Sequence, residues 1–332
     1  MKKTKSNLGK YVGFSGDWSF KFYFGREENK PILIGFLNGL FEGEKVIQDL
    51  HYRPVEQDGD LENERKVIFD LYCTGIDGEH FIIEMQQLYQ DFFKDRTVFY
   101  TSRLINKLIP KGYKGNTYEL PEVYFIGILE FELGETEPGK YFYDVALCDK
   151  QSNRVFYEKL GYKLLVLPNF NKDEADIKTD MDMWLYLLKN MSKLDKIPDF
   201  LDKRVFGLIF DIGEVAKLTP EDKMAYEASL KHKRDAENTY ATAQRLGHDR
   251  GLKEGLKEGL KEGIKEGIKE GIKEGLKEGI KEGIKKGLKE GLAQGEQKKA
   301  METALKFKMM GLPLEQIAQG TGLTTDEIEK LK

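Results

Sequence analysis

The segment VIFDLYCTGIDGEHFIIEMQQL, residues 67–88, contains two apolar runs of strand character separated by a turn signal. Polar side chains interrupt both runs, with Asp70 in the first and Glu84 and Gln86 in the second. Two strand-like runs around an Asp-Gly dipeptide predict a β-hairpin. Carboxylates are rare inside buried strands unless they are paired. The pairing register of this hairpin therefore decides whether the segment is only structural or also forms a site.

The length of the hairpin loop determines which side chains share a face. A two-residue loop at the Asp-Gly dipeptide would put Asp70 and Glu84 on opposite faces. A three-residue loop over residues 76–78 would instead use Gly78 in the left-handed conformation, which glycine adopts without steric cost. Asp70 would then lie opposite Glu84, with Cβ atoms roughly 5 Å apart, and Gln86 would share their face. The second register predicts a positive φ at Gly78.

Two carboxylates at this distance repel each other, and burial adds a desolvation cost. The neighbouring positions of the segment provide no cation to balance them. Mg²⁺ would balance the charge, because it binds through one or two carboxylates and keeps other positions for water and phosphate oxygens. Such an ion polarises a phosphate and lowers the pKa of a bound water. The alternative is an exposed hairpin edge with its polar side chains in solvent.

An acid on one strand, a hairpin turn and then E-x-Q on the next strand resemble the arrangement of the PD-(D/E)xK nuclease superfamily. More narrowly, the chain resembles the group of recombination-promoting nucleases (Rpn) and related transposases. The matching stretches are DWSFKFYFGREENKPILIGFLN, FDLYCTGIDGEHFIIEMQ, DRTVFYTSR and the glycine-rich charged repeat near the end. This resemblance implies a restriction-endonuclease-like mixed sheet flanked by helices, and DNA as the partner. It also implies metal-dependent DNA endonuclease activity linked to recombination, transposition or defence against foreign DNA.

The resemblance assigns catalytic positions to Asp70, Glu84 and Gln86, with the two acids holding Mg²⁺, or Mn²⁺ as the alternative ion. Gln86 replaces the lysine that is usual in the superfamily. An amide can orient the attacking water or a phosphate oxygen but carries no charge, so the metal would stabilise more of the developing charge. The superfamily often adds an acid from its first helix, and Asp17 is the candidate, with Glu28 as the alternative. Each of these two also has an ordinary interpretation as a helix cap or surface residue.

The helix expected after the hairpin carries three cationic residues, Lys94, Arg96 and Arg103. Arg96 and Arg103 are seven residues apart and therefore share a helix face. They are candidates for contact with DNA phosphates beside the metal, or they are solvated surface charges. Phosphate contacts would not report the base sequence.

Composition sets limits on the rest of the molecule. The chain has 332 residues and a formal net charge of −4, so it has no overall attraction for nucleic acid. Cys73 and Cys148 both lie in apolar runs and are interpreted as buried free thiols, which fits a reducing compartment. No apolar run reaches the roughly 20 residues of a membrane span, and the basic start lacks an apolar signal core. We expect a cytoplasmic protein without a membrane partner.

Hydrophobic patterning predicts the order of elements in the globular part. A helix pair is expected over residues 17–43 and an amphipathic helix over 89–109. The apolar runs after this helix predict three strands. Because these strands are apolar on both faces, the sheet is expected to be packed on both sides. These strands are expected at residues 123–131, 141–149 and 162–170, and helices at 179–191 and 198–218.

The predicted organisation has four parts: a nuclease-like domain at 1–220, a helical connector at 221–250, a repeat at 251–296 and a small unit at 297–332. In the repeat, twelve glycines recur at every fourth residue from Gly251 to Gly295, and Leu or Ile follows each of the first eleven. Each glycine costs a helix about 1 kcal/mol relative to alanine. A four-residue period advances the apolar stripe by about 40° per repeat. A spacing above 3.6 residues favours a right-handed supercoil.

The repeat has three interpretations: self-association, a solvated spacer and nucleic-acid contact. Its exposed apolar stripe favours a homo-oligomer held through residues 251–295. The last segment has the spacing of a helix-turn-helix, with a first helix from Pro313 and a second after Thr324 or Thr325. The second helix would be acidic, which opposes phosphate binding. A structural or pairing module is therefore favoured over a DNA reader.

Two functions of different classes follow. The first is the metal-dependent endonuclease described above. The second is a catalytically weak or inactive nuclease-fold protein that acts as an oligomeric binding module through its repeat tail. Metal binding by the acid pair separates them.

Overall fold

The computed structural model describes residues 8–57, 67–109, 119–134, 137, 139–201 and 204–332. The chain divides into two compact units, residues 1–242 and 243–332, and each is considered separately. Within the described residues, no helix has both the length and the apolar character needed to cross a membrane.

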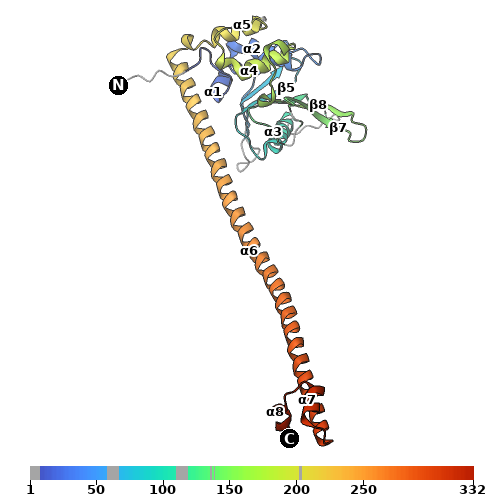
Figure 1. Ribbon diagram of the computed structural model, residues 1–332. Coiled ribbons are helices and arrows are strands. Elements are labelled where there is room, and N and C mark those ends of the chain that lie inside the picture. The colour runs from blue at the N-terminus through green and yellow to red at the C-terminus, as the bar shows by residue number, and fades with distance from the viewer. Residues whose placement is uncertain (1–7, 58–66, 110–118, 135–136, 138, 202–203) are drawn as a thin grey trace, which may run out of the picture. The chain divides into compact units, whose positions relative to one another are not determined.

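The first unit is built on a six-stranded sheet with the strand order β1-β4-β5-β6-β8-β7 (Figure 1). Strands β5, β6 and β8 are parallel, whereas β1, β4 and β7 are antiparallel to their neighbours. This mixed sheet with flanking helices confirms the predicted fold class. The strands are β1 (Leu50–Tyr52), β4 (Leu71–Gly75), β5 (His80–Gln86), β6 (Val123–Leu129), β7 (Phe142–Cys148) and β8 (Val155–Val166), and β2 (Glu56–Gln57) pairs separately with β3 (Val67–Ile68).

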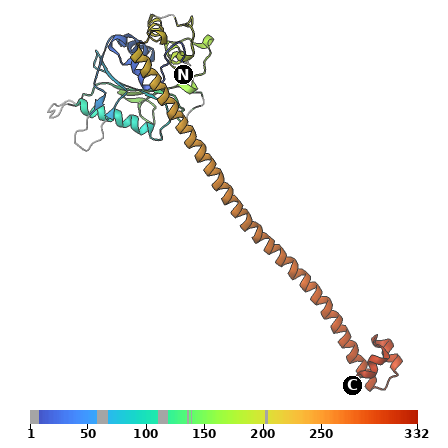
Figure 2. The same ribbon diagram turned by 90° about the vertical axis from the view of Figure 1, so that its left-hand side faces the viewer.

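Helices cover both faces of this sheet (Figure 2). Phe81 and Ile83 of β5 join the core beneath four helices, whereas Ile82 between them joins the second core, beneath one helix. This alternation follows from the two-residue period of a strand, and it explains why β5 is apolar throughout. The four helices are α1 (Asp17–Phe24), α2 (Lys30–Leu40), α4 (Asp180–Asn190) and α5 (Arg204–Ile212), and the single helix is α3 (Phe93–Leu108).

Most predicted elements are present, with three differences. The strand expected at 162–170 is β8, which begins seven residues earlier, at Val155, because it pairs with β7 along a long ribbon. The first apolar run of the hairpin divides between β3 and β4, so Asp70 lies in the bend between them. The short strands β1 and β2 were not predicted, because they have too few residues to show a period.

The prediction of two buried thiols is wrong for one of them. Both cysteines are free, but Cys73 is buried in β4 whereas Cys148 is exposed at the end of β7. The apolar run around Cys148 belongs to the far end of the β7–β8 ribbon, where Leu147 and Phe156 are also exposed. An apolar run therefore did not indicate burial at this end of the sheet.

The helix α6 (Pro220–Met309) begins on the first unit and continues through the second. Its start is fixed by Asp222, which pairs with Arg26 at 2.5 Å, and by buried Tyr226, whose hydroxyl accepts from the Gly13 N–H at 3.2 Å. In the second unit, α7 (Leu314–Thr321) and α8 (Thr325–Lys330) pack against the end of α6 around Ala304, Ile317, Leu323 and Ile328. Thr324 caps α8 through a capping box, which confirms the predicted pair of short helices.

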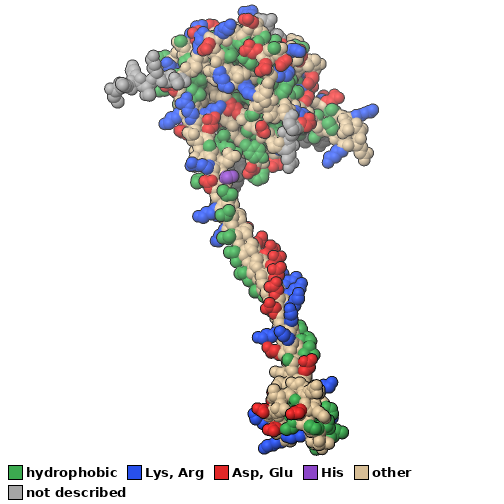
Figure 3. Space-filling view, viewed as in Figure 1, with side chains coloured by type: hydrophobic (Ala, Val, Ile, Leu, Met, Phe, Trp, Pro, Cys, Tyr) green, Lys and Arg blue, Asp and Glu red, His purple; other side chains and the backbone are tan. Residues whose placement is uncertain are grey.

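The repeat lies within α6 with its apolar side chains in solvent (Figure 3). All eleven Leu and Ile side chains from Leu252 to Leu292 are 55–74% exposed. A Cβ added at any glycine from Gly251 to Gly295 would meet no atom within 4 Å. No contact within the described part of the chain therefore requires these glycines.

This freedom gives a direct test. At concentrations that keep the chain monomeric, we expect Gly259→Ala and Gly267→Ala each to stabilise the helical repeat by about 1 kcal/mol, because alanine restricts the unfolded chain and clashes with no described residue. Circular dichroism at 222 nm during urea denaturation measures the change, with Lys257→Ala and Lys265→Ala as controls of similar helix propensity. Loss of stability in the glycine variants would show that these positions contact another molecule.

Candidate active site

The loop of the central hairpin fixes the register. Gly78 has a φ of 90°, and the N–H of Gly75 donates to the carbonyl oxygen of Glu79 at 2.9 Å. The loop therefore consists of residues 76–78, with glycine at its left-handed position. The three-residue loop and the positive φ at Gly78 are both confirmed.

Asp70 faces Glu84 across this hairpin. Leu71 pairs with Ile83, so the next position on each chain brings the two acids together. The backbone N–H of Asp70 donates to Glu84 Oε1 at 3.0 Å, and the N–H of Met85 donates to Asp70 Oδ2 at 2.9 Å. Each carboxylate is thus held by the backbone of the opposite chain segment, in the close pair that the register predicted.

Burial makes this pair electrostatically demanding. Glu84 is 1% exposed, and its burial, with the neighbouring Asp70 charge, raises the pKa of Glu84 to about 7. Burial also raises the pKa of Asp70, although the hydrogen bond from Met85 opposes the shift. A nearby cation would stabilise both anions, because opposite charge favours the ionised form.

Arg96 of α3 supplies one such cation. Its Nη2 lies 2.8 Å from Glu84 Oε2, and its Nη1 donates to Gln90 Oε1 at 2.8 Å. The guanidinium also lies over the Tyr100 ring, 5.2 Å from its centroid. Sequence reasoning proposed Arg96 for phosphate contact and found no cation for the acids. It missed this pair because α3 returns to the hairpin only in the folded chain.

Gln86 completes the group. Its side chain is buried, and its Nε2 donates to Glu84 Oε2 at 3.0 Å. Glu84 Oε2 therefore accepts from both Gln86 and Arg96, which fixes the orientation of the carboxylate. The amide oxygen of Gln86 keeps its capacity to accept a further hydrogen bond.

Glu130 is a carboxylate that sequence reasoning missed. It directly follows β6, its N–H donates to the Gln86 carbonyl at 2.9 Å, and its side chain accepts from Lys233 at 2.5 Å and from Ser15. A usable signal existed, because a polar residue just after a parallel strand lies at the sheet edge where ligands bind in α/β folds. Its carboxylate is already paired, so it anchors α6 beside the acid pair.

The remaining candidates lie farther from the pair. Asp17 opens α1, is 69% exposed in its side chain and pairs with Lys21 at 2.7 Å. Its charge nevertheless raises the pKa of Asp70, so the two are within electrostatic reach. Glu28 is exposed in a 3-10 turn before α2. On α3, Lys94 is exposed and Arg103 is half-buried.

The donor set fits one class of metal. In the described parts of the chain, no group of three or more His, Cys, Asp or Glu residues could hold an ion by itself. Zn²⁺ in catalytic sites takes three protein ligands, so it does not suit two acids. Mg²⁺ suits them, because it binds through one or two carboxylates and completes its shell with water and phosphate oxygens. Asp70 and Glu84 therefore fit a hard divalent cation that is shared with a phosphorylated substrate.

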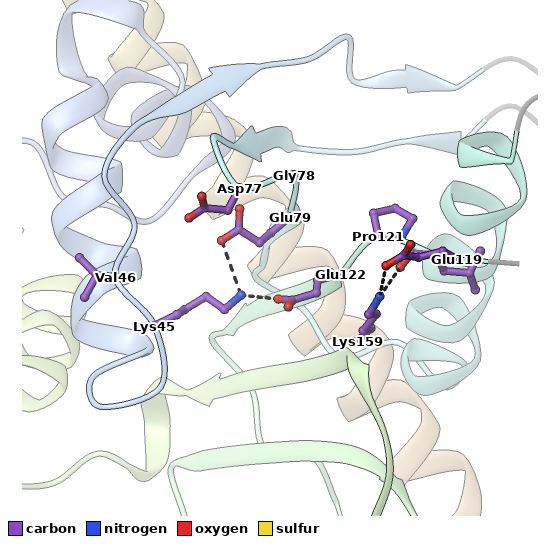
Figure 4. A pocket seen from close by; sticks show the side chains of 10 residues that line it. Lys45, Val46, Asp77, Gly78, Glu79, Glu119, Pro121, Glu122 and Lys159 are labelled. Atoms are coloured by element: carbon purple, nitrogen blue, oxygen red, sulfur yellow. Dashed lines mark hydrogen bonds and ion pairs between the residues drawn. The ribbon is translucent and has the colours of Figure 1, made fainter. Parts of the chain in front are cut away.

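A separate cleft of about 570 Å³ lies at the loop end of the hairpin (Figure 4). Lys45 lies there between Glu79, at 3.5 Å, and Glu122, and Lys159 pairs with Glu119 at 3.3 Å. Glu79 is five residues from Glu84, which is roughly 17 Å along a strand. This cleft is therefore distinct from the acid pair, and the charges of its lysines are matched by acids.

A mixed sheet whose central hairpin carries an acid and then E-x-Q at one edge defines a nuclease fold of the PD-(D/E)xK class. Residues 15–243 match the PD-(D/E)XK nuclease family transposase, and the chain belongs to this family. The match extends from just before α1 into α6, and it supports a nuclease-type function and an association with DNA. No curated protein and no solved structure matches the chain.

The ion pair of Arg96 predicts a measurable effect on stability. We expect Arg96→Gln to reduce the free energy of unfolding of the metal-free protein by about 1–3 kcal/mol, because a buried carboxylate loses its charged partner. Addition of Mg²⁺ should restore part of this loss, since the ion replaces the missing charge. Urea denaturation with and without Mg²⁺ measures both effects.

Lys94→Gln is the matched control for this experiment, because Lys94 lies on the same helix and is exposed. The control should unfold like the unmodified protein. Equal stability of the Arg96 variant and the control would contradict the role of Arg96 as the counter-ion of Glu84.

Proposed function

We propose that this protein is a metal-dependent DNA endonuclease that hydrolyses phosphodiester bonds during recombination, transposition or defence against foreign DNA. The observation that carries the proposal is the buried Asp70–Glu84 pair, with Gln86 bonded to the same carboxylate. Two adjacent acids are suited to Mg²⁺, or Mn²⁺, that is shared with a phosphate. The free thiol of Cys73 fits action in the reducing cytoplasm.

Each residue has a distinct role in this proposal. Asp70 and Glu84 would hold the ion, which when bound supplies Lewis-acid polarisation of the phosphate and a lower pKa for a bound water. Gln86 keeps Glu84 in place through its amide nitrogen, and its amide oxygen orients the attacking water by accepting a hydrogen bond from it. Asp17 is within electrostatic reach of Asp70 and is the further acid that we propose beside the ion.

Arg96 has a second role beside the substrate. With a divalent cation at Glu84, its guanidinium is no longer needed as a counter-ion and can contact a phosphate oxygen, for which its planar fork is suited. Arg103 lies about two turns further along the same face of α3 and extends this cationic side, and Lys94, exposed at the start of the helix, is a further candidate for contact with the DNA backbone. These contacts would position the DNA without reading its bases.

The alternative is a catalytically weak or inactive nuclease-fold protein that binds partners as an oligomer. Gln86 favours it, because the usual lysine charge is absent. Calorimetric titration with Mg²⁺ or Mn²⁺ separates the two functions, since an inactive module has no requirement for the ion.

We also propose that residues 251–295 hold chains together in a homo-oligomer. The eleven exposed Leu and Ile side chains are too regular for a simple tether, and glycines at every fourth residue permit close approach of another helix. A stripe that advances about 40° per repeat completes a turn in roughly nine repeats. One straight partner helix therefore covers only part of the stripe. Two helices that cross at an interaxial angle near −50° are favoured over a parallel pair.

The acid pair gives the sharpest test of the endonuclease proposal. We expect Asp70→Ala and Glu84→Ala each to abolish Mg²⁺-dependent nicking of plasmid DNA, because one carboxylate cannot hold the ion in place. Asp77→Ala, an exposed acid in the loop of the same hairpin, should nick normally. Circular dichroism verifies that all variants are folded. Full cleavage by either acid variant would exclude this pair as the active site.

The tail is tested by deletion. We expect removal of residues 251–295 to lower the oligomeric state and to leave nicking intact, because the acids lie in the first unit. Light scattering at tens of micromolar compares the full chain with the deletion. If both proteins are monomers, the repeat is a spacer.

A further inference from the structure

A second cleft, of about 530 Å³, lies beside the acid pair along α3. Arg96 lines this cleft and also contacts Glu84 at 2.8 Å. Only the side chain of Arg96 therefore separates the cleft from the acid pair, where we propose that the scissile phosphate binds. Its other walls include Phe92, Phe99 and Tyr100.

The aromatic side chains of this cleft are unusually exposed. Phe92 is 73% exposed and Phe99 is 49% exposed. Clustered apolar exposure marks binding surfaces more often than it serves stability. The ring of Tyr100 is held in place by the second core, because its centroid lies 5.5 Å from that of the Phe69 ring. The cleft thus offers flat apolar faces on a supported helix.

The charges of the cleft select among the parts of a nucleotide. Asp91 and Asp95 also line it, and both are exposed. Their carboxylates repel a phosphate but accept hydrogen bonds from the amino groups of a nucleobase. Among the described residues that line the cleft, Arg96 is the one cation, and it lies at the end toward Glu84. The chemistry therefore places a neutral base in the cleft and its phosphate beside Arg96.

We propose that this cleft binds an unpaired nucleobase next to the scissile phosphate. The preferred substrate is consequently single-stranded DNA, or duplex DNA with an extruded base, because a paired and stacked base does not present its faces or its Watson–Crick edge. The proposal rests on the proposed nuclease function and specifies the substrate of the same site.

Fluorescence of a single-stranded oligonucleotide that contains 2-aminopurine tests this proposal, because stacking on an aromatic ring quenches the probe. The full-length protein is titrated in Ca²⁺ buffer, and the same oligonucleotide annealed to its complement is the second substrate. We expect quenching and tighter binding with the single strand. The double variant Phe92→Ala, Phe99→Ala should weaken this binding at least fivefold, since stacking is worth about 1–3 kcal/mol per base.

Phe156→Ala is the matched control, because Phe156 is an aromatic residue on β8 with 81% exposure. Normal binding by this control, with loss in the double variant, supports the cleft as the base site. Equal binding by the double variant and the unmodified protein would overturn the proposal, as would equal affinity for single strand and duplex.

A parallel nicking assay with Mg²⁺ and Mn²⁺ separates this inference from the proposed function. Cleavage that the double variant retains in full, without a preference for unpaired DNA, overturns the base cleft but leaves the endonuclease in place. Phenylalanine-dependent quenching without cleavage of any DNA supports the base cleft and overturns the endonuclease.

Discussion

The rest of the site depends on two hydrogen bonds across the hairpin, from the Asp70 N–H to the Glu84 carboxylate and from the Met85 N–H to the Asp70 carboxylate. Each acid accepts from the backbone of the opposite chain segment, at 2.9–3.0 Å, so neither carboxylate can move without breaking the edge of the hairpin. The arrangement forces two like charges together in a buried position, which is costly unless cations are close. The acid pair therefore needs Arg96 as a counter-ion and Gln86 as a hydrogen-bond donor before either residue takes part in any chemistry.

In the proposed function, the cation next to the pair would differ between the metal-free and the metal-bound protein. In the metal-free protein, a side chain of the same molecule takes this place, so the empty site is not left with two unbalanced anions. A divalent ion would have to compete with a guanidinium that is already bonded at 2.8 Å. Metal affinity and metal-free stability would consequently be coupled, because a change that weakens the contact of Glu84 with Arg96 would favour the metal-bound state.

The sequence was informative where structure is determined locally. The sequence limited the hairpin loop to two lengths, and the three-residue length with glycine at the left-handed position correctly placed Asp70 opposite Glu84. The class of the fold followed from alternating helices and doubly apolar strands. By contrast, the contacts of Arg96 and Glu130 depend on where α3 and β6 return to the hairpin, which no local pattern encodes. Cys148 was misjudged because an apolar run predicts a strand, but burial depends on what packs over it.

The four-residue period of the repeat has a consequence for recognition. Coiled coils select one alignment through features that differ along the sequence, such as a buried polar residue or uneven charges. Residues 251–282 offer almost no such feature, because each unit repeats glycine, an aliphatic residue, lysine and glutamate. Every unit is related to the next by the same screw operation, so a bound partner finds an equivalent site about 6 Å further along. Any binding to this segment would thus be degenerate in position, and a partner could slide along the repeat because its successive sites are equivalent.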